Sequence, residues 1–585
     1  MNYRLIKPML PNYTAVEQVL FNRGISKNDS YHFLNTTDED INSFLLFGEE
    51  TLKEAAIKLT SCIAGGGVAV MIIDCDCDGY TASALLINYL YDCFPTWTEN
   101  NLMWFIHSGK QHGLSDFPNE TIEADLVICP DSSSNDYQYH KILRDRGIDV
   151  IVLDHHEAEY ISEDATIINN QLCDYPNKQM SGVGVTWQFC RYLDYLMEQN
   201  YADNYLDLVA LGMDADMMSM TSLETKHLII KGLQDVSNPF ISAMADKNSF
   251  SLGGKLTPIG IAFYIAPYVN AINRSGTLEE KELVFKSMLK HKAFEKIPSN
   301  KRGHKPDEME MLYIQAIRTA NNVKVRQTKA QDAGMALLEK MIEDNNLLDH
   351  KVLLFLLEPG AIDRNIAGLA ANKIMAKYQR PCCVLTKVTD NDGNVSYQGS
   401  ARGCDKVGIL TFKDICVETG YTIFAEGHQG AFGIGIKQED IPAFIEATDI
   451  ALKNMPSEPI YFVDYIYQAN LINPNHILEI AALEDIWGKD MDEPFIAVSG
   501  IKVTPEMVTI YRKKTNTMKI QLPNKVELTK FNVTEDECNK FQTNNESFIE
   551  IDVVGRCVAN EYFGTVTPQI RIEEYEVVDS SKYIF

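Results

Sequence analysis

Four short apolar runs, each followed within a few residues by aspartate, constrain the fold of this chain more than any other feature. They lie at residues 68–73, 126–129, 150–153 and 208–211. Each run is apolar on both faces and has the length of a strand, so each is predicted to be a buried strand of a parallel sheet. Ligands of open α/β sheets bind at the carboxyl ends of strands, so the residues after these runs are expected to gather at one edge.

Acidic residues and histidines follow the runs. The first run leads into Asp-Cys-Asp-Cys-Asp-Gly at residues 74–79, the second into Asp131, and the third into Asp-His-His at residues 154–156. The fourth is followed by Asp214 and Asp216. So many acids in one place cannot all stay ionised without cations. Oxygen and imidazole ligands without clustered thiolates favour Mn²⁺ or Mg²⁺ over structural zinc, so a two-metal hydrolytic site is predicted.

Composition limits the class of protein. A chain of 585 residues is too long for one core, so three or four domains are expected. The 13 cysteines are odd in number and form no CxxC pairs, which favours reduced thiols and a cytoplasmic location. The sequence has no 18-residue apolar stretch and no signal peptide, so no membrane association is expected. The net charge of −28 argues against nonspecific binding to nucleic acid but does not exclude a nuclease, because metals neutralise acids and a basic groove can be local.

Hydrophobic periodicity divides the chain into five predicted parts. The first two are an N-terminal helical segment, residues 1–62, and an α/β domain with a doubly wound parallel sheet, residues 63–235. A helical connector with a long helix follows at residues 236–345, and then a second α/β domain at residues 346–456. In residues 457–585 the period changes to two, which predicts a small β barrel or sandwich.

The order of these motifs resembles that of the DHH phosphoesterase superfamily and, within it, of the RecJ-type single-strand-specific exonucleases. Residues 74–79 resemble the first family motif, and Asp131 stands where the second motif has its aspartate. Residues 154–156 carry the Asp-His-His signature, and Asp216 closes a segment similar to the fourth motif. Any one of these matches would be a weak signal, whereas the ordered set is a strong one.

Further segments narrow the resemblance to RecJ. Arg-Gly-Ile at residues 23–25, Ser-Gly-Val-Gly-Val at residues 181–185 and the block at residues 266–274 resemble RecJ sequences. Gly427 and His428 resemble the Gly-Gly-His motif of the DHHA1 substrate-binding domain. The predicted C-terminal β domain lies where RecJ has an OB fold. The resemblance therefore implies a DHH domain, a long connecting helix, a DHHA1 domain and an OB-like barrel.

Three positions depart from the family pattern. Glu426 replaces the first glycine before Gly427, Ser132 and Ser133 follow Asp131 in place of Cys-Gly, and residues 363–365 lack the usual Trp-His pair. These departures affect the expected phosphate contacts and substrate preference, and they leave the expected metal ligands intact.

The resemblance implies a role for each residue of the predicted metal site. The expected metal ligands are Asp74, Asp76, Asp78, Asp131, His155 and Asp216. All of them except Asp74 are also expected to be catalytic, together with His156, which by analogy contacts the scissile phosphate. Asp154 is expected to support the ligands without binding metal, and Asp214 to lie beside the site.

Alternative readings of the same residues exist. The Asp-rich string could open a calcium loop, but Leu85 stands where that loop needs glutamate. Asp131 could be a helix cap, and His155 a buried, hydrogen-bonded histidine.

The substrate contacts follow from the resemblance as well. Arg402 and His428 are expected to grip phosphates, and Gly427 allows backbone N–H groups to approach the anion. Asn270 and Arg274 are expected to contact phosphate too. The alternatives are a glycine-rich turn for the first group and ordinary interdomain pairing for the second. The basic segment Tyr-Arg-Lys-Lys at residues 511–514 either binds a single strand or is a solvated hairpin.

Three functions stay open at this stage. The first is a 5′→3′ exonuclease that degrades single-stranded DNA, held between the two α/β domains, in DNA recombination, repair or replication. The second is a DHH phosphodiesterase acting on short oligoribonucleotides, pAp or cyclic dinucleotides, and the third is a non-catalytic replication scaffold. The long C-terminal part after Pro459 favours the first over the second, and the complete ligand set disfavours the third. Expected partners are single-stranded DNA and a single-strand-binding protein or helicase, with the protein itself a monomer.

Overall fold

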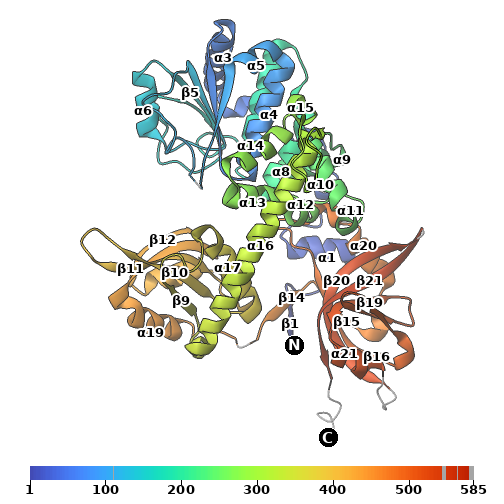
Figure 1. Cartoon of the computed structure of the whole chain (residues 1–585). Coiled ribbons are helices and arrows are strands. Elements are labelled where there is room, and N and C mark those ends of the chain that lie inside the picture. Colours follow the sequence, from blue (N-terminus) through green and yellow to red (C-terminus); the bar gives the residue numbers. More distant parts are fainter. Residues whose placement is uncertain (110, 457, 543–547, 563, 579–585) are drawn as a thin grey trace. The chain divides into compact units, whose positions relative to one another are not determined.

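The computed structural model describes residues 1–109, 111–456, 458–542, 548–562 and 564–578. The chain forms two compact units (Figure 1). The first unit comprises Asn28–Val325 and Leu483–Glu493. The second unit comprises Met1–Lys27, Arg326–Ala482 and Pro494–Phe585. Residue 457, where the predicted C-terminal domain begins, lies outside the described residues, and the finer domain boundaries remain predictions.

A five-stranded parallel sheet forms the core of the first unit, in the order β3-β2-β4-β5-β6. Its strands are β2 (Ala69–Ile73), β3 (Leu102–Ile106), β4 (Leu126–Pro130), β5 (Asp149–Asp154) and β6 (Thr166–Asn169). β2 and β4 are buried along their whole length, which explains why their sequences are apolar on both faces. The first three predicted strands are therefore present, and the predicted α/β fold class is confirmed.

Helices cover both faces of this sheet. Val70, Val127 and Val152 pack with residues of α6 on one face. α4 and α7 contact strands of the sheet, and α8 packs against these two helices. The helices around the sheet are α2 (Ser30–Leu34), α3 (Glu49–Ala64), α4 (Cys77–Cys93), α5 (Pro95–Asn101), α6 (Tyr137–Asp145), α7 (Gly182–Met197), α8 (Leu206–Ala215) and α9 (Leu223–Gln234).

The prediction of a fourth strand at residues 208–211 is wrong, because this run lies inside helix α8. Residues 206–214 are all buried, since α8 packs against α4, α7 and α9. A helix enclosed in this way is apolar all round, and a short apolar run does not distinguish it from a buried strand. Asp216 is consequently delivered by the end of a helix, where it is the C-terminal cap residue of α8.

Asp74, Asp76 and Asp78, which follow the first predicted strand, do not all lie in a loop. Helix α4 begins at Cys77, Asp76 is its N-terminal cap, and Asp78 lies in its first turn. Gly79 makes this early start possible, because a Cβ atom there would lie 2.5 Å from the Cβ of Asp74. The helix can therefore begin directly against the end of β2.

A helical region follows the sheet. Its elements are α10 (Pro239–Lys247), α11 (Ser249–Leu252), α12 (Pro258–Tyr264), α13 (Ala266–Ser275), α14 (Leu278–Ser287), α15 (Lys290–Ala293) and the hairpin of β7 (Lys296–Pro298) and β8 (Met309–Met311). The long helix predicted within residues 236–345 is present as α16 (Leu312–Asp344). Among the described helices, none combines the length and the apolar character needed to cross a membrane.

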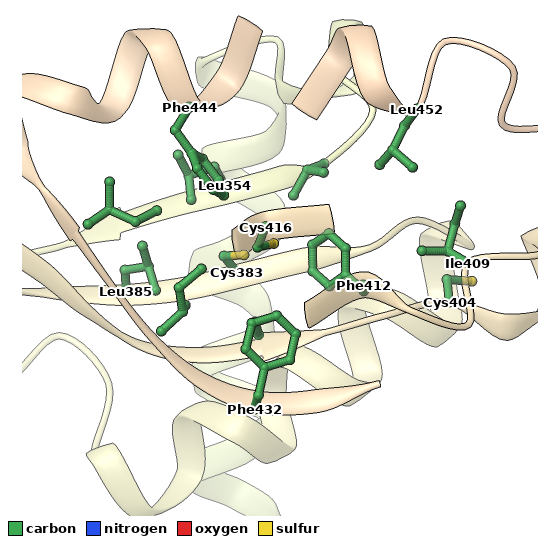
Figure 2. Close-up of a cluster of buried hydrophobic side chains, with 14 of the residues drawn as sticks. Leu354, Cys383, Leu385, Cys404, Ile409, Phe412, Cys416, Phe432, Phe444 and Leu452 are labelled. Atoms are coloured by element: carbon green, nitrogen blue, oxygen red, sulfur yellow. The ribbon is translucent and has the colours of Figure 1, made fainter. Parts of the chain in front are cut away.

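The second unit contains a mixed five-stranded sheet in the order β12-β13-β11-β10-β9. Its elements are β9 (Leu353–Leu357), α17 (Arg364–Tyr378), β10 (Cys382–Thr389), β11 (Val395–Arg402), α18 (Phe412–Glu418), β12 (Thr422–His428), β13 (Ala431–Lys437) and α19 (Ile441–Ala451). Leu354 and Cys383 pack on one face with Phe412 of α18 and Phe444 of α19 (Figure 2). Alternate strand residues pack on the opposite face with α17 and α16.

The C-terminal part of the second unit is a seven-stranded sheet in the order β15-β16-β20-β21-β19-β18-β17. Its elements are β15 (Tyr465–Gln468), α20 (Pro474–Ala481), β16 (Phe495–Val503), β17 (Val508–Arg512), β18 (Asn516–Gln521), β19 (Glu527–Val533), α21 (Glu535–Gln542), β20 (Ile549–Tyr562) and β21 (Thr565–Val577). This region carries the period-two pattern that the sequence predicts.

The N-terminus contributes a strand that the predicted helical segment does not include. β1 (Asn2–Leu5) pairs in parallel with β14 (Ile460–Val463). The next element, α1 (Ala15–Asn22), ends at Arg23, whose guanidinium lies 2.6 Å from the fully buried carboxylate of Asp464. These contacts join residues more than 400 positions apart, so local sequence patterns do not reveal them.

Candidate metal centre

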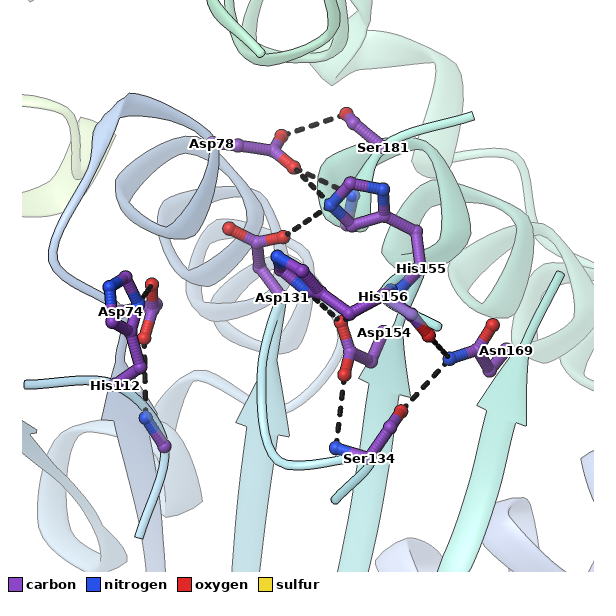
Figure 3. A network of polar contacts seen from close by, with 12 residues as sticks. Asp74, Asp78, His112, Asp131, Ser134, Asp154, His155, His156, Asn169 and Ser181 are labelled. Carbon is purple, nitrogen blue, oxygen red and sulfur yellow. Dashed lines mark hydrogen bonds and ion pairs between the residues drawn. The ribbon is translucent and has the colours of Figure 1, made fainter. Parts of the chain in front are cut away.

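Asp78 is held by the beginning of helix α7. Its Oδ1 accepts hydrogen bonds from Ser181 Oγ (2.9 Å) and Val183 N (3.2 Å), and its Oδ2 accepts one from Gly182 N (2.6 Å; Figure 3). Backbone N–H groups at a helix N-terminus stabilise an anion. The Ser-Gly-Val-Gly motif therefore fixes the orientation of a buried carboxylate.

Asp131 follows β4 in an unusual backbone conformation, with φ of 64°. Its backbone N donates to Leu153 O on β5 (2.7 Å), which holds the residue at the strand end. A Cβ atom at position 182 would lie 2.3 Å from Asp131 Oδ1, so only glycine leaves room for this carboxylate. That Oδ1 atom is buried and accepts no hydrogen bond from the described residues. A buried oxygen without a donor is suited to a cation.

His155 brings three carboxylates together. Its Nε2 lies 3.2 Å from Asp131 Oδ1, 3.4 Å from Asp216 Oδ2 and 4.0 Å from Asp78 Oδ2. Burial lowers the pKa of His155 to about 4, so the ring is neutral near pH 7. A neutral imidazole has a lone pair for a metal, and the strand, loop and helix ends thus converge on one point.

Asp154 orients both histidines. Its Oδ1 accepts from His155 N (2.7 Å), His156 N (3.2 Å) and His156 Nδ1 (2.7 Å), and its Oδ2 accepts from Ser134 N (3.0 Å). Burial alone would raise the pKa of Asp154, but the bond from His156 and the charge of that histidine hold it below its usual range. The same bond raises the pKa of His156 to about 9. His156 is therefore a cation near neutral pH, and its side chain is 55% exposed.

Asp74 and Asp76 lie close to Asp131. Asp76 Oδ1 accepts from Gly79 N (3.0 Å) as the cap of α4. Asp74 accepts from His112 Nδ1 (2.7 Å) and Gly113 N (3.3 Å), and the bond from His112 raises the pKa of that histidine to about 11. His112 is absent from the predicted site. Its position a few residues after the apolar stretch that forms β3 is the signal that could have found it.

Among the described residues, potential ligand atoms form four groups, in each of which all atoms lie within 4.8 Å of one another, and two of these groups consist only of predicted metal ligands. One group is Asp78, His155 and Asp216, and the other is Asp74, Asp76 and Asp131. Asp214, whose exclusion from the metal was predicted, is in neither group, although its buried Oδ2 accepts no hydrogen bond from the described residues.

The carboxylates are electrostatically strained by their neighbours. Burial first, and then Asp74 and Asp78, raise the pKa of Asp76 to about 6. Burial, followed by Asp78 and Asp76, raises the pKa of Asp216 to about 8, and burial with the same neighbours holds the pKa of Asp131 well above its usual range. Bound cations would stabilise the ionised forms of these carboxylates. The donor set of carboxylate oxygens and one neutral imidazole fits Mn²⁺ or Mg²⁺.

The predicted phosphate-binding residues of the second unit lie at one end of its sheet. Arg402 on β11 and His428 on β12 are both register partners of Ala431 on β13, so the two side chains share one face of the sheet. Arg402 Nε donates to Asn372 Oδ1 (2.7 Å), which fixes the guanidinium on this face. Gly427 has a φ of 121° and its carbonyl accepts from Lys413 Nζ (2.8 Å), so the glycine is needed for the turn.

Asn270 and Arg274 belong to the first unit, together with the metal centre. They are four positions apart on α13 and so lie on one side of this helix. Both are half-buried, and the described part of the chain provides no hydrogen-bond or ion-pair partner for the Arg274 side chain. The alternative that Arg274 forms an ordinary ion pair is therefore not supported by any partner among the described residues.

Comparison with known proteins places these features in a family. The family model for the N-terminal domain of the DHH family matches residues 68–213, and the model for the RecJ OB domain matches residues 463–574. The chain is 32% identical over 582 residues to YorK of the SPbeta prophage of Bacillus subtilis (strain 168), which is named as a single-strand DNA-specific exonuclease. This match covers 99% of the chain and 98% of YorK. The chain belongs to the RecJ-like family of DHH proteins.

Two further comparisons also find similarity between this chain and RecJ proteins. The chain is 23% identical over 583 residues to the single-stranded-DNA-specific exonuclease RecJ of Bacillus subtilis (strain 168), covering 96% of the chain and 68% of that protein. Its fold matches the crystal structure of RecJ in complex with Mn²⁺ from Thermus thermophilus, with a TM-score of 0.69, 18% identity and coverage of 99% of this chain and 80% of that chain. The predicted family, α/β fold and OB-like C-terminal domain are confirmed.

Proposed function

We propose that this protein is a metal-dependent exonuclease that hydrolyses single-stranded DNA in the 5′→3′ direction. The observation that carries the proposal is the convergence of His155 Nε2 with the carboxylates of Asp131, Asp216 and Asp78 within 4.0 Å. The relatives' names support single-stranded DNA as the substrate, and the related RecJ structures in complex with Mn²⁺ and Mg²⁺ support a divalent metal.

Two ions would be held by the two groups of ligand atoms around Asp131. Asp78, His155 and Asp216 would hold one, and Asp74, Asp76 and Asp131 the other. When bound, such a pair supplies an activated water and neutralises charge on the phosphate and the leaving oxygen. The raised pKa values of Asp76 and Asp216 support this assignment, because bound cations would make the ionised forms favourable.

His156 and Asp154 act on the substrate as a pair. Asp154 binds Nδ1 of His156 and leaves Nε2 directed away from the pair, and the pKa of about 9 keeps the ring protonated. A protonated Nε2–H can donate a charge-assisted hydrogen bond to a phosphate oxygen at the scissile position. His156 thus binds and orients the phosphate, while Asp154 fixes the ring.

Cationic and amide side chains would bind further phosphates of the strand. Arg402 and His428, with the backbone at Gly427, form one such group on the sheet of the second unit. Arg274 and Asn270 form another on α13. Arginine presents a planar fork that matches phosphate oxygens, and the lack of a partner for Arg274 within the described residues supports a ligand-binding role.

The C-terminal sheet offers a surface that would retain the strand. Lys519, Thr529, Arg571 and Arg556 are register partners on four neighbouring strands, so they form one row across the sheet. Phe531 is 50% exposed, and the Arg571 guanidinium lies 5.7 Å from the centre of its ring. Basic grooves with exposed aromatic rings bind single strands by charge and base stacking.

Tyr511 lies in the adjacent row, which contains Phe531, and supports the predicted hairpin. It is 46% exposed, and it lies in register with Thr517 and, through it, with Phe531. Arg512 follows it at the exposed end of β17. The hairpin at residues 511–514 would therefore continue the same binding surface.

The wider role is part of the proposal. The protein would act in DNA recombination, repair or replication in the cytoplasm, as a monomer that works with a single-strand-binding protein or a helicase. A DHH phosphodiesterase for short oligoribonucleotides, pAp or cyclic dinucleotides would not need the RecJ-type OB domain at residues 463–574. A non-catalytic scaffold would not need the intact ligand groups.

Cleavage of end-labelled oligonucleotides tests the proposal. Single-stranded DNA and RNA labelled separately at each end should be compared with Mn²⁺, with Mg²⁺ and with a chelator. We expect metal-dependent release of mononucleotides from the 5′ end of DNA, and loss of release in Asp131→Ala. Asp214→Asn is the matched control, because Asp214 is a neighbouring buried acid outside both ligand groups. Metal-independent cleavage, or full turnover in Asp131→Ala, would contradict the proposal.

A further inference from the structure

A pair of stacked tyrosines lies directly after the Asp-His-His segment. The rings of Tyr137 and Tyr160 are 3.8 Å apart between centres and inclined by 16°. Tyr137 begins α6, which follows β4, and Tyr160 lies four residues after His156, which follows β5. The pair is therefore at the carboxyl edge of the sheet, the edge that also carries the metal centre.

The segment that carries Tyr160 is fixed by hydrogen bonds to the beginning of α6. Asn135 Nδ2 donates to Glu157 O (2.8 Å), and the hydroxyl of Tyr137 bonds to Asn135 Oδ1 (2.9 Å) and to Tyr160 O (3.2 Å). Tyr160 N donates to the same hydroxyl (3.3 Å). The geometry of the stacked pair is thus set before any ligand binds.

The outer ring of the pair is available for a ligand. Tyr137 is half-buried, whereas Tyr160 is 55% exposed. Asn135, Tyr137, Glu157, Ala158 and Glu159 line a cavity of about 520 Å³ at this place. Tyr160 therefore presents an aromatic face, backed by a second ring, next to a cavity that begins one residue after His156.

The charges at the cavity select the kind of ligand. Glu157 and Glu159 are exposed, and neither carboxylate has a cationic partner in the part of the chain that the structure describes. Two free carboxylates repel a phosphate group, but they accept hydrogen bonds from the N–H groups of a base. An aromatic face with an acidic rim therefore fits the base of a nucleotide, while the phosphate lies toward His156.

We propose that Tyr160 is a stacking platform for one nucleobase of the strand, next to the phosphate that His156 contacts. This inference rests on the proposed nuclease function and adds a base subsite to it. Base stacking on an aromatic side chain tolerates every sequence, because all bases have a π face. The platform would position the scissile bond without making cleavage depend on sequence.

Substrates that lack one base test the platform. The value of kcat/KM should be measured on oligonucleotides with a single abasic site at each of the first positions from the cleaved end. We expect one position at which the wild-type protein loses about 10-fold, within the roughly 5- to 150-fold that stacking of one base contributes. If the kcat/KM of the wild-type protein is the same for every abasic position as for the intact strand, the inference is overturned, and no variant is needed.

The variant Tyr160→Ala should lose about the same 10-fold on the intact strand. On the sensitive abasic strand, the kcat/KM of Tyr160→Ala should fall by less than about 2-fold more, because the stacking between Tyr160 and the base is already absent. Tyr160→Phe is the matched control and should behave as wild type, since it keeps the ring. A merely structural role for Tyr160 would make the two losses add, and additive losses or an unaffected Tyr160→Ala overturn the inference. Failure of the proposed function would appear differently, as no cleavage of any single strand by the wild type.

Discussion

Replacing Asp76 by asparagine should stabilise the metal-free protein while destroying its metal response. The new amide keeps a side-chain oxygen that can cap α4 through Gly79 N, and asparagine is as good a helix cap as aspartate. The substitution removes only the charge. Burial and the charges of Asp74 and Asp78 raise the pKa of Asp76 from 3.8 to about 6.

The magnitude and the pH dependence follow from this shift. One pKa unit corresponds to about 1.4 kcal/mol, so the ionised Asp76 side chain destabilises the metal-free fold by up to about 3 kcal/mol. The folded protein binds this proton more tightly than the unfolded chain, so stability falls as pH rises from about 4 to about 6. Above that range the full penalty applies, and the advantage of Asp76→Asn should be largest at about pH 8 and absent at about pH 3.

Calorimetric unfolding with and without Mn²⁺ measures both effects. At about pH 8 in a chelator, the transition of the unit that contains the metal centre should move to higher temperature in Asp76→Asn than in wild type. Mn²⁺ should raise the temperature of this transition strongly in wild type and weakly in the variant, because the variant has lost a metal ligand. A variant that is less stable than wild type under these chelating conditions, or equally stabilised by Mn²⁺, would refute the reasoning.

Three other perturbations have defined outcomes. Arg402→Ala and His428→Ala should each raise KM for a short oligonucleotide by about 10- to 100-fold with Mn²⁺ affinity retained, and unchanged kinetics would exclude a phosphate contact. Gly182→Ala should reduce turnover by roughly 100-fold, because its Cβ would meet Asp131 Oδ1 at 2.3 Å; equal turnover would mean that the Asp131 position is not critical. Replacing Arg571 and Phe531 together by alanine should weaken binding and lower its salt dependence only for long strands, and equal losses on short strands would contradict a retention surface.

The sequence predicts most of the parallel sheet and of the acidic cluster, because these features are local. A buried strand followed by a polar loop appears in consecutive residues, as at β2 with Asp74 and at β5 with Asp154. The topology rule for open sheets then brings the loops together. Carboxylate oxygens of Asp131 and Asp78 accordingly lie within 4.0 Å of His155 Nε2.

The fourth apolar run shows where such reasoning stops. Residues 208–211 are buried on all sides in either conformation, and only the neighbours α4, α7 and α9 decide that the run is helical. The consequence for function is small, since the end of α8 delivers Asp216 to the same place as a strand end would. Asp216 thus lies beside His155 although the sequence predicted the wrong kind of element before it.

Contacts between particular distant residues were not predicted. His112 reaches Asp74 across 38 positions, and Arg23 reaches Asp464 across 441. The Arg-Gly-Ile motif at residues 23–25 consequently has a structural explanation, because Arg23 neutralises a carboxylate that is fully buried. Breaking a buried ion pair of this kind leaves an uncompensated charge, so the position needs a cation whatever the substrate of the protein.

Anomalous diffraction from a crystal soaked in Mn²⁺ tests the central claim most directly. The proposed centre predicts two anomalous peaks about 4 Å apart, one contacted by His155 and Asp216 and the other by Asp76, with Asp131 adjoining both. Asp131→Asn should reduce the occupancy of both. A protein that binds Mn²⁺ elsewhere, or shows no peak beside His155 at saturating Mn²⁺, would contradict the proposed two-metal site.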